Sequence, residues 1–196
     1  MTVATEPDRS LGPATAALAT GVPVVLLDTH GAVLVQAAAA ATTASLHFAI
    51  RHSSGLIHAA MPSADLDRLR IPDQQVLPGE DSGTGFTIAV DAATGISTGI
   101  SAADRARTLR VLADTNTVAA DLIRPGHVLP IRCGAGRHGI WEHAVDLVRA
   151  SGQPPVAMAC RLTGDDGDIL AARAAVEFGF AHRITVCNAA AYRARC

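Results

Sequence analysis

Lysine is absent from this sequence, and all sixteen of its basic residues are arginine. A lysine amine is required for Schiff-base chemistry, for anchoring pyridoxal phosphate and for the phosphate-binding loop of nucleotide hydrolases. Acting alone, the chain is therefore excluded from these three classes of enzyme.

Aromatic residues are also scarce, at 3% of the 196 residues, although hydrophobic residues make up 49%. A chain of this length buries a substantial core in one domain. We therefore predict a core built from alanine, valine, leucine and isoleucine. We expect residues 1–10 to form a flexible N-terminus and residues 11–196 to form a single domain.

Signals for membranes, secretion and nucleic acid are missing as well. No apolar run approaches the roughly 18 residues that span a bilayer, and residues 1–13 lack the apolar core of a signal peptide. The net charge of −2 is not the basic footprint of a nucleic-acid-binding protein. We expect a cytoplasmic protein without membrane or nucleic-acid partners.

The four cysteines are widely spaced and include no CxxC pair. They are Cys133, Cys160, Cys187 and Cys196. Such spacing is typical of reduced cytosolic thiols rather than of a disulfide framework or a zinc site.

Helix and strand patterns mix along the chain without strict strand–helix–strand alternation, which favours an α+β fold. Apolar, β-branched runs predict strands at 22–27, 32–36, 56–60, 86–90, 128–131, 156–162 and 183–187. Helices are predicted at 13–20, from Thr42 to near Gly55, and at 62–69, 101–114, 139–150, 168–178 and 189–195. The segment 71–84, rich in proline, glycine and aspartate, is predicted to be a long functional surface loop.

The most informative helix start lies within residues 98–106. Ser101 is predicted to cap the helix, and Asp104 follows three residues later, as in a capping box. The free backbone N–H groups and the positive dipole end of such a helix suit an anion or a sugar hydroxyl. An ordinary capped helix without a ligand is the alternative interpretation.

A series of longer segments carries a family resemblance. In chain order they are GVPVV (21–25), RHSSG (51–55), FTIAVD (86–91), TGISAADRA (98–106), RPGHVLP (124–130), AVDL (144–147) and the tail 165–193. Together they resemble the 3,4-dihydroxy-2-butanone 4-phosphate synthases. The resemblance implies a single-domain α/β sandwich of the α+β class, working as a homodimer with the active site between subunits. It also implies a lyase that converts ribulose 5-phosphate into a four-carbon ketone phosphate and formate in riboflavin biosynthesis.

The metal ligands of that family do not carry over to this chain. The family's first strand leads into an acidic loop whose glutamate binds magnesium, but here the shorter stretch 28–33 keeps only Asp28. Ile140 stands in place of the second ligand, a histidine, and isoleucine cannot bind a metal. Because magnesium prefers carboxylate oxygens, we expect no metal and no other cofactor.

Three further substitutions alter the same predicted pocket. Trp141 replaces a phosphate-binding threonine, Arg161 replaces a third acid, and His58 replaces a cysteine. The resemblance thus predicts a retained scaffold around a changed active site.

The resemblance assigns the remaining polar groups to substrate binding and catalysis. It implies that Arg137 contacts a phosphate or another anion and that His127 reaches the site of the neighbouring subunit. The predicted catalytic residues are His58, His127 and Asp104. The predicted substrate-binding residues are Asp28, Thr98, Ser101, Arg137 and Trp141, with Thr98, Ser101 and Asp104 on the floor of the site.

Three of these assignments have structural alternatives. His58 exchanges protons with a substrate, or it is a core histidine bonded to a backbone carbonyl. Trp141 stacks on a planar substrate, or it packs in the core beside Val145 and Val148. Asp104 is either a site residue or the cap of its helix.

A histidine-based site for zinc or iron is conceivable, because imidazole suits both metals. Its ligands would come from His30, His138 and His143, which lie in segments near the family pocket. No H-x-H or H-E-x-x-H spacing supports such a site.

Three functions remain open for a small-molecule metabolite as the partner. The main hypothesis is a repurposed enzyme doing metal-independent isomerisation, dehydration or lyase chemistry on a small carbonyl or anionic metabolite in specialised biosynthesis. The second is a non-catalytic homologue that binds a metabolite or a partner. The third is the authentic magnesium-dependent conversion of ribulose 5-phosphate, with a rearranged loop supplying the ligands.

Overall fold

The computed structural model describes residues 12–77, 79–80 and 83–189. The predicted flexible N-terminus and Cys196 lie outside these residues. So does the predicted helix 189–195, apart from Ala189, which lies in a turn. In the described part of the chain, no helix is long and apolar enough to cross a membrane.

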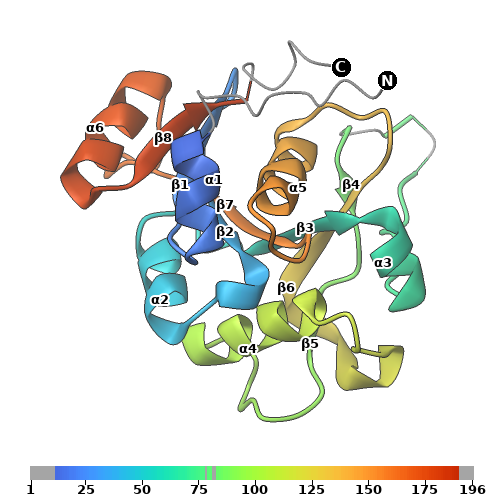
Figure 1. The fold of residues 1–196 in the computed structure, drawn as a ribbon. Helices are drawn as coiled ribbons and strands as arrows, with labels where there is room; N and C mark the ends of the chain where they lie inside the picture. The colour runs from blue at the N-terminus through green and yellow to red at the C-terminus, as the bar shows by residue number, and fades with distance from the viewer. Residues whose placement is uncertain (1–11, 78, 81–82, 190–196) are drawn as a thin grey trace, which may run out of the picture.

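One mixed sheet of eight strands runs through the molecule (Figure 1). Seven strands follow the order β4-β6-β3-β7-β2-β1-β8, and β5 pairs with β6 off this path. Their bounds are β1 (Val24–Asp28), β2 (Gly31–Ala37), β3 (His58–Pro62), β4 (Gly85–Phe86), β5 (Val90–Ala92), β6 (Leu122–Cys133), β7 (Ala157–Arg161) and β8 (Thr185–Asn188).

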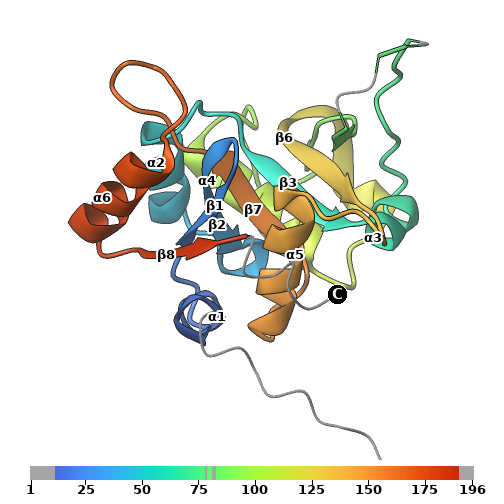
Figure 2. The ribbon, with the colours of Figure 1, turned by 90° about the horizontal axis from the view of Figure 1, so that it is seen from above.

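Helices cover both faces of this sheet, as the view from above shows (Figure 2). On one face lie α1 (Gly12–Ala19) and α5 (Ile140–Ala150), and on the other α2 (Thr43–Arg51), α4 (Ala102–Ala113) and α6 (Ala172–His182). The short helix α3 (Ser63–Arg68) follows β3, and 3-10 turns occupy Ala38–Ala40 and Ala119–Asp121. The layered α+β sandwich expected from the sequence is confirmed.

The two faces of β1 explain why its sequence is an unbroken apolar run. Val24 and Leu26 point into the cluster beneath α1 and α5, whereas Val25 and Leu27 point into the cluster beneath α2 and α4. Alternate side chains of a strand face opposite sides of the sheet, so burial on both sides requires apolar residues at every position. The buried core consists of small and aliphatic residues, as predicted from the scarcity of aromatics.

A tight turn joins β1 to β2 and fixes the place of Asp28. Asp28 pairs with Gly31, and its Oδ1 accepts a hydrogen bond from the backbone N–H of His30 at 2.8 Å. Aspartate commonly closes a turn in this way. Gly31 has a φ of +112°, and a Cβ there would meet Leu170 O at 2.8 Å, so the turn demands glycine.

The predicted single strand at 86–90 is wrong. Residues 85–86 form β4 and residues 90–92 form β5, and the backbone between them leaves the ladder. Thr87 N–H donates to Pro130 O, but Ile88 N–H donates to Pro72 O, which belongs to the neighbouring loop. The alternating pattern indicated partial burial correctly and could not show that the chain changes partners.

The predicted helix at 168–178 begins four residues too early. Ile169 forms a bridge with Thr163, and the backbone N–H of Leu170 donates to Leu162 O. These pairings hold the segment in an extended hairpin, so α6 begins at Ala172. The predicted strand at 128–131 is likewise only part of β6, which spans Leu122–Cys133.

Three cysteines lie in the described residues, and all three are free thiols. Burial raises the pKa of Cys160 and of Cys187 to about 11, and it also raises the pKa of Cys133. Thiols that stay protonated at neutral pH are poor nucleophiles, so these three residues serve packing.

Substitution of Gly126 by alanine tests the close approach of β5 to β6. A Cβ at Gly126 would come within 2.0 Å of the Val90 carbonyl carbon. We expect Gly126→Ala to destabilise the protein by about 1–3 kcal/mol and to lower Tm in thermal unfolding. Gly12→Ala is the matched control, because a Cβ there meets nothing within 4 Å. An unchanged Tm for Gly126→Ala would contradict this packing.

Candidate active site

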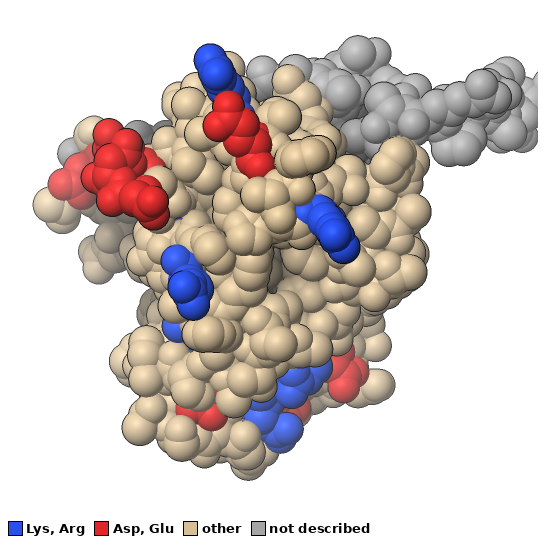
Figure 3. All heavy atoms as spheres, turned by 90° about the vertical axis from the view of Figure 1, so that its left-hand side faces the viewer, with Lys and Arg blue, Asp and Glu red and all other residues tan. Residues whose placement is uncertain are grey.

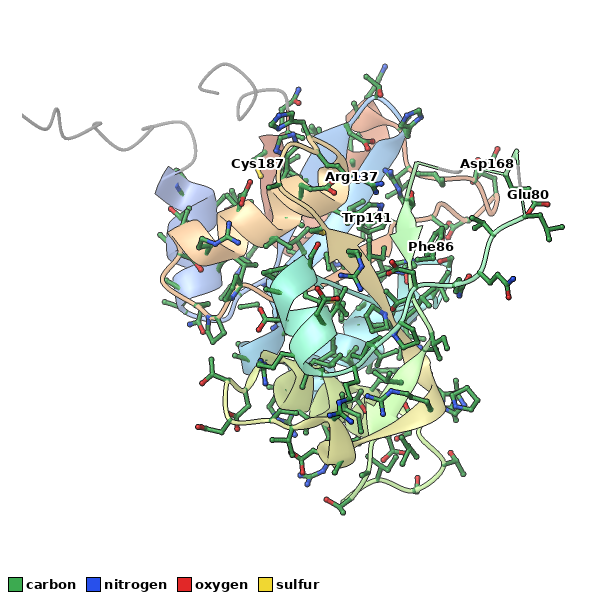
Figure 4. The ribbon with its side chains drawn as sticks, turned by 90° about the vertical axis from the view of Figure 1, so that its right-hand side faces the viewer. Glu80, Phe86, Arg137, Trp141, Asp168 and Cys187 are labelled. Carbon is green, nitrogen blue, oxygen red and sulfur yellow. The ribbon has the colours of Figure 1, made fainter. Side chains whose placement is uncertain are left out.

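A cavity of about 690 Å³ lies where the β1–β2 turn, the end of β7 and the start of α5 meet. The residues lining it are Asp28, Thr29, His30, Gly83, Thr84, Arg137, His138, Gly139, Ile140, Trp141, Glu142, His143, Arg161, Asn188 and Ala189. Arg137 and Trp141 lie close together at the start of α5 (Figure 4). The cavity therefore combines two arginines, several histidines and one aromatic wall.

An ion pair between Asp28 and Arg161 forms one side of the cavity. Arg161 Nη1 lies 3.0 Å from Asp28 Oδ1, and Nη2 lies 3.1 Å from Oδ2. Burial raises the pKa of Asp28, but the hydrogen bonds from Arg161 and His30 outweigh it and hold this pKa below its ordinary value of 3.8. Both oxygens of Asp28 are thus engaged by a guanidinium in a bidentate arrangement.

Aromatic rings continue the cavity wall behind this ion pair. The central carbon of the Arg161 guanidinium lies 5.7 Å from the Trp141 ring centroid, within cation–π range. The ring centroid of Trp141 lies 4.9 Å from that of His58, and the His58 centroid lies 6.1 Å from that of Phe86. Trp141 therefore both lines the cavity and packs against the core, so the two interpretations of this residue are compatible.

His58 lies behind the cavity rather than on its surface. Only 5% of the residue is exposed. Burial lowers its pKa to about 4, a backbone hydrogen bond at Leu129 opposes this, and the Arg161 charge adds to the lowering. At neutral pH the ring is uncharged and a weak base. Its burial favours the alternative of a core histidine over a proton-transfer role, and its Nδ1 atom is buried without a hydrogen-bond partner among the described residues.

A second cluster of predicted residues surrounds the start of α4. Ser101 Oγ accepts a hydrogen bond from Asp104 N–H at 3.0 Å, as the capping pattern predicted. The Asp104 carboxylate accepts from Ser97 Oγ at 2.7 Å, from Ser97 N–H at 3.1 Å and from Gly99 N–H at 3.0 Å. The Ser97 hydroxyl is the main cause that lowers the pKa of Asp104, against the opposing effect of burial. The Asp104 carboxylate therefore stabilises the loop that contains Ser97 and Gly99, just before α4.

His127 belongs to the same cluster through Asp91. Asp91 Oδ1 accepts from the backbone N–H of His127 at 3.0 Å, and Asp91 Oδ2 lies 2.7 Å from His127 Nδ1. The His127 side chain is 38% exposed, whereas that of Asp91 is 3% exposed. A buried carboxylate thus orients an accessible imidazole, which is the usual arrangement of a general base.

The structure divides the predicted site residues into two groups within one chain. Asp28, Arg137 and Trp141 line the cavity, whereas Thr98, Ser101, Asp104 and His127 do not. Asp104 lies on α4, and His127 lies on β6 beside its partner Asp91 on β5. Both α4 and β5 lie in the lower half of Figure 1, whereas α5 lies in the upper half. One chain by itself therefore does not place the predicted floor beneath the cavity.

Charged side chains on the face that carries α2 and α6 are scattered among uncharged surface (Figure 3). The arginines on this face do not gather into one broad basic patch, and acidic side chains lie between them. The distribution of charge on this face agrees with the near-neutral composition of the chain.

Comparison with known proteins identifies the family. A sequence profile of 3,4-dihydroxy-2-butanone 4-phosphate synthase matches residues 13–192. The chain belongs to the 3,4-dihydroxy-2-butanone 4-phosphate synthase family. This is an enzyme family of lyases, and the fold and segment order above agree with it.

Individual relatives support the same assignment. The chain is 40% identical over 193 residues to the riboflavin biosynthesis protein RibBA of Salinispora arenicola, covering 93% of this chain but only 46% of that protein. It thus spans about half the length of such relatives. It is 35% identical over 178 residues to the 3,4-dihydroxy-2-butanone 4-phosphate synthase of Vibrio cholerae, covering 87% of this chain and 82% of that protein.

Solved structures of the synthase match closely as well. A cation-free form has a TM-score of 0.88 at 32% identity and covers 94% of this chain and 95% of that one. A complex with two magnesium ions has a TM-score of 0.86 at 32% identity and covers 92% of this chain and 93% of that one. The synthase family therefore includes members that bind magnesium.

The residues around the cavity do not fit magnesium in this member of the family. Both oxygens of Asp28 are paired with Arg161, and Glu142 Oε2 accepts from Gly139 N–H at 3.1 Å. Ile140 offers no ligand atom. Within the described residues, no group of three or more histidine, cysteine, aspartate or glutamate side chains is placed to hold a metal ion. A hard cation would also face the charge of Arg161.

The same observation gives no support to a rebuilt histidine metal site. His30, His138 and His143 all line the cavity, as their sequence positions suggested. They do not form a ligand group together in the part of the chain that the structure describes.

Sequence reasoning missed two functional candidates. The resemblance presents Arg161 only as the loss of an acid, although a change of charge together with the single remaining Asp28 is a signal for an ion pair. Asp91, the partner of His127, lies in a matching segment and gave no signal of its own, because the two are 36 positions apart in the chain.

The pH dependence of stability tests the buried, uncharged state of His58. Its pKa is lowered from 6.5 to about 4, so below pH 6.5 the unfolded chain binds a proton that the folded chain does not. Stability is therefore full above pH 6.5 and falls as the pH drops towards 4.

Urea denaturation of wild type and of His58→Phe at pH 7 and at pH 5 tests this expectation. From pH 7 to pH 5, wild type should lose roughly 2 kcal/mol more unfolding free energy than the variant. Equal losses in the two proteins would show that His58 titrates normally.

Proposed function

We propose that this chain is a synthase-family enzyme that binds a small anionic ketone in the cavity and moves the proton next to its carbonyl without a metal. The observation that carries the proposal is that Arg137 and Arg161 line one cavity beside Trp141. Arginine forks bind carboxylate and phosphate groups bidentately, and the indole ring offers a flat apolar wall.

The names of the relatives favour a specific substrate. Relatives at 35% and 40% identity are named as 3,4-dihydroxy-2-butanone 4-phosphate synthase and as a riboflavin biosynthesis protein, so ribulose 5-phosphate is the first ketone to test. This support is stronger for the authentic synthase reaction than for any repurposed one. Against the magnesium-dependent form of that reaction stands the donor set of the cavity, in which Asp28 is already paired.

His127 is the best-placed proton acceptor among the predicted residues. Asp91 faces Nδ1, which leaves Nε2 of an accessible ring for the substrate. Since His127 does not line the cavity of its own chain, the proposal includes a homodimer in which the second copy supplies it. A C2 dimer would place two such composite sites in each assembly.

Deuterium exchange tests the reaction. In D2O, the protein should incorporate deuterium next to the carbonyl of ribulose 5-phosphate, followed by NMR, and a chelator should leave the rate unchanged. His127→Ala should slow exchange by roughly 100-fold, the usual contribution of a general base. Formate that appears only with magnesium would establish the authentic synthase instead. If neither deuterium exchange nor formate is detected, the remaining hypothesis is a non-catalytic binding protein.

Mixing variants tests the shared site. His127→Ala and Arg137→Ala remove groups that the dimer would draw from different chains, so each alone should be inactive. Mixed and allowed to exchange subunits, they should recover about a quarter of the wild-type exchange rate, since half of the dimers contain one intact site. Full inactivity of the mixture, with a dimer confirmed by sedimentation, would show that both residues act within one chain.

A further inference from the structure

We propose that Arg161 is the fixed cation of the cavity and binds the anionic group of a small planar ligand. This inference rests on the proposed function in one respect, namely that the cavity takes a small anion. It goes further by assigning the binding group and the shape of the ligand.

The first step is the geometry of the guanidinium. Asp28 accepts one hydrogen bond from each Nη atom. A guanidinium has five N–H donors, so three remain after these two bonds. Arg161 lines the cavity, and its side chain is 19% exposed. The remaining donors therefore belong to a group that is held rigid and still reaches the cavity.

The second step concerns the carboxylates around it. Among the residues that the structure describes, Asp28 and Glu142 are the acidic ones that line the cavity. Asp28 forms an ion pair with Arg161, and Glu142 accepts a hydrogen bond from the backbone N–H of Gly139 at the start of α5. Asp28 therefore has no oxygen left for a cation, Glu142 has one oxygen engaged, and Arg137 adds a second positive charge to the lining. The arrangement favours an anion.

The third step is the flat wall. The guanidinium lies over the Trp141 ring at 5.7 Å, and the ring is fixed from behind by His58 at 4.9 Å. A ligand whose anionic group meets Arg161 has its body beside the indole. Planar, conjugated bodies gain the most from such a wall. The ligand class is thus a carboxylate or phosphate attached to a planar or enolic carbon frame.

Arg161 supplies a positive charge at the cavity without a bound ion, and its bidentate contact with Asp28 fixes the direction of the guanidinium.

Trp141 makes the test direct, because it is the only tryptophan in the chain. Its fluorescence is titrated with benzoate, acetate, inorganic phosphate and magnesium chloride, and calorimetry repeats each titration. We expect saturable responses to the anions, with benzoate tighter than acetate because of its ring, and no response to magnesium.

Two matched variants give the decisive comparison. Arg161→Gln should weaken benzoate binding by roughly tenfold through loss of charge-assisted bonds. Asp28→Asn should strengthen it, because it removes the competing charge and keeps the oxygen that closes the β1–β2 turn. If the ion pair has only a structural role, both variants should be less stable than wild type, and their anion affinities should not change in opposite directions. Circular dichroism and the double variant Asp28→Asn/Arg161→Gln control for folding.

The possible failures are distinguishable. Anion binding that survives Arg161→Gln and is lost in Arg137→Gln would overturn the role of Arg161 and leave the proposed function standing. A chelator-reversible response to magnesium in wild type would overturn the fixed-cation inference. Absence of any anion response by both methods would overturn this inference together with the anion-binding cavity.

Discussion

The pairing register of three neighbouring strands is the constraint on which the cavity depends. Asp28 pairs with Gly31 at the β1–β2 turn, and Val33 of β2 pairs with Arg161 of β7. These ladders bring residues 133 positions apart into a bidentate ion pair. A shift of one residue would turn every side chain of a strand to the opposite face, so the buried faces of β1 and β2 also fix the ion pair.

The ion pair in turn decides what chemistry the cavity offers. A carboxylate that is free and accessible can take a metal or a proton, whereas Asp28 is held ionised by its partner and has no oxygen to spare. The guanidinium gains a fixed direction from the same contact and lies over Trp141. The cavity of this chain thus presents donors and an aromatic wall, in a scaffold whose family includes magnesium-bound members.

Sequence alone gave the scaffold because the scaffold depends on patterns that are local. The apolar run of β1, the Ser101 cap and the amphipathic α5 each follow from nearby residues, and the segment order supplied the family. The split of the predicted 86–90 strand was not visible, since Thr87 and Ile88 choose partners from distant segments. The same limit hid Arg161 and Asp91. Their partners, Asp28 and His127, are set by strand order and not by spacing.

Within one chain, the predicted site residues are divided in space between the cavity and the start of α4. Capping by Ser101 and saturation of Asp104 explain the segment 98–106 as a loop that holds itself together. The accessible group beside this loop is the His127 ring, which the buried Asp91 carboxylate orients. The cavity holds two arginines and Trp141, whereas the imidazole that a buried carboxylate orients lies outside it in the same chain. A second copy of the chain is the simplest body that can join them, and this is the physical argument for the proposed dimer.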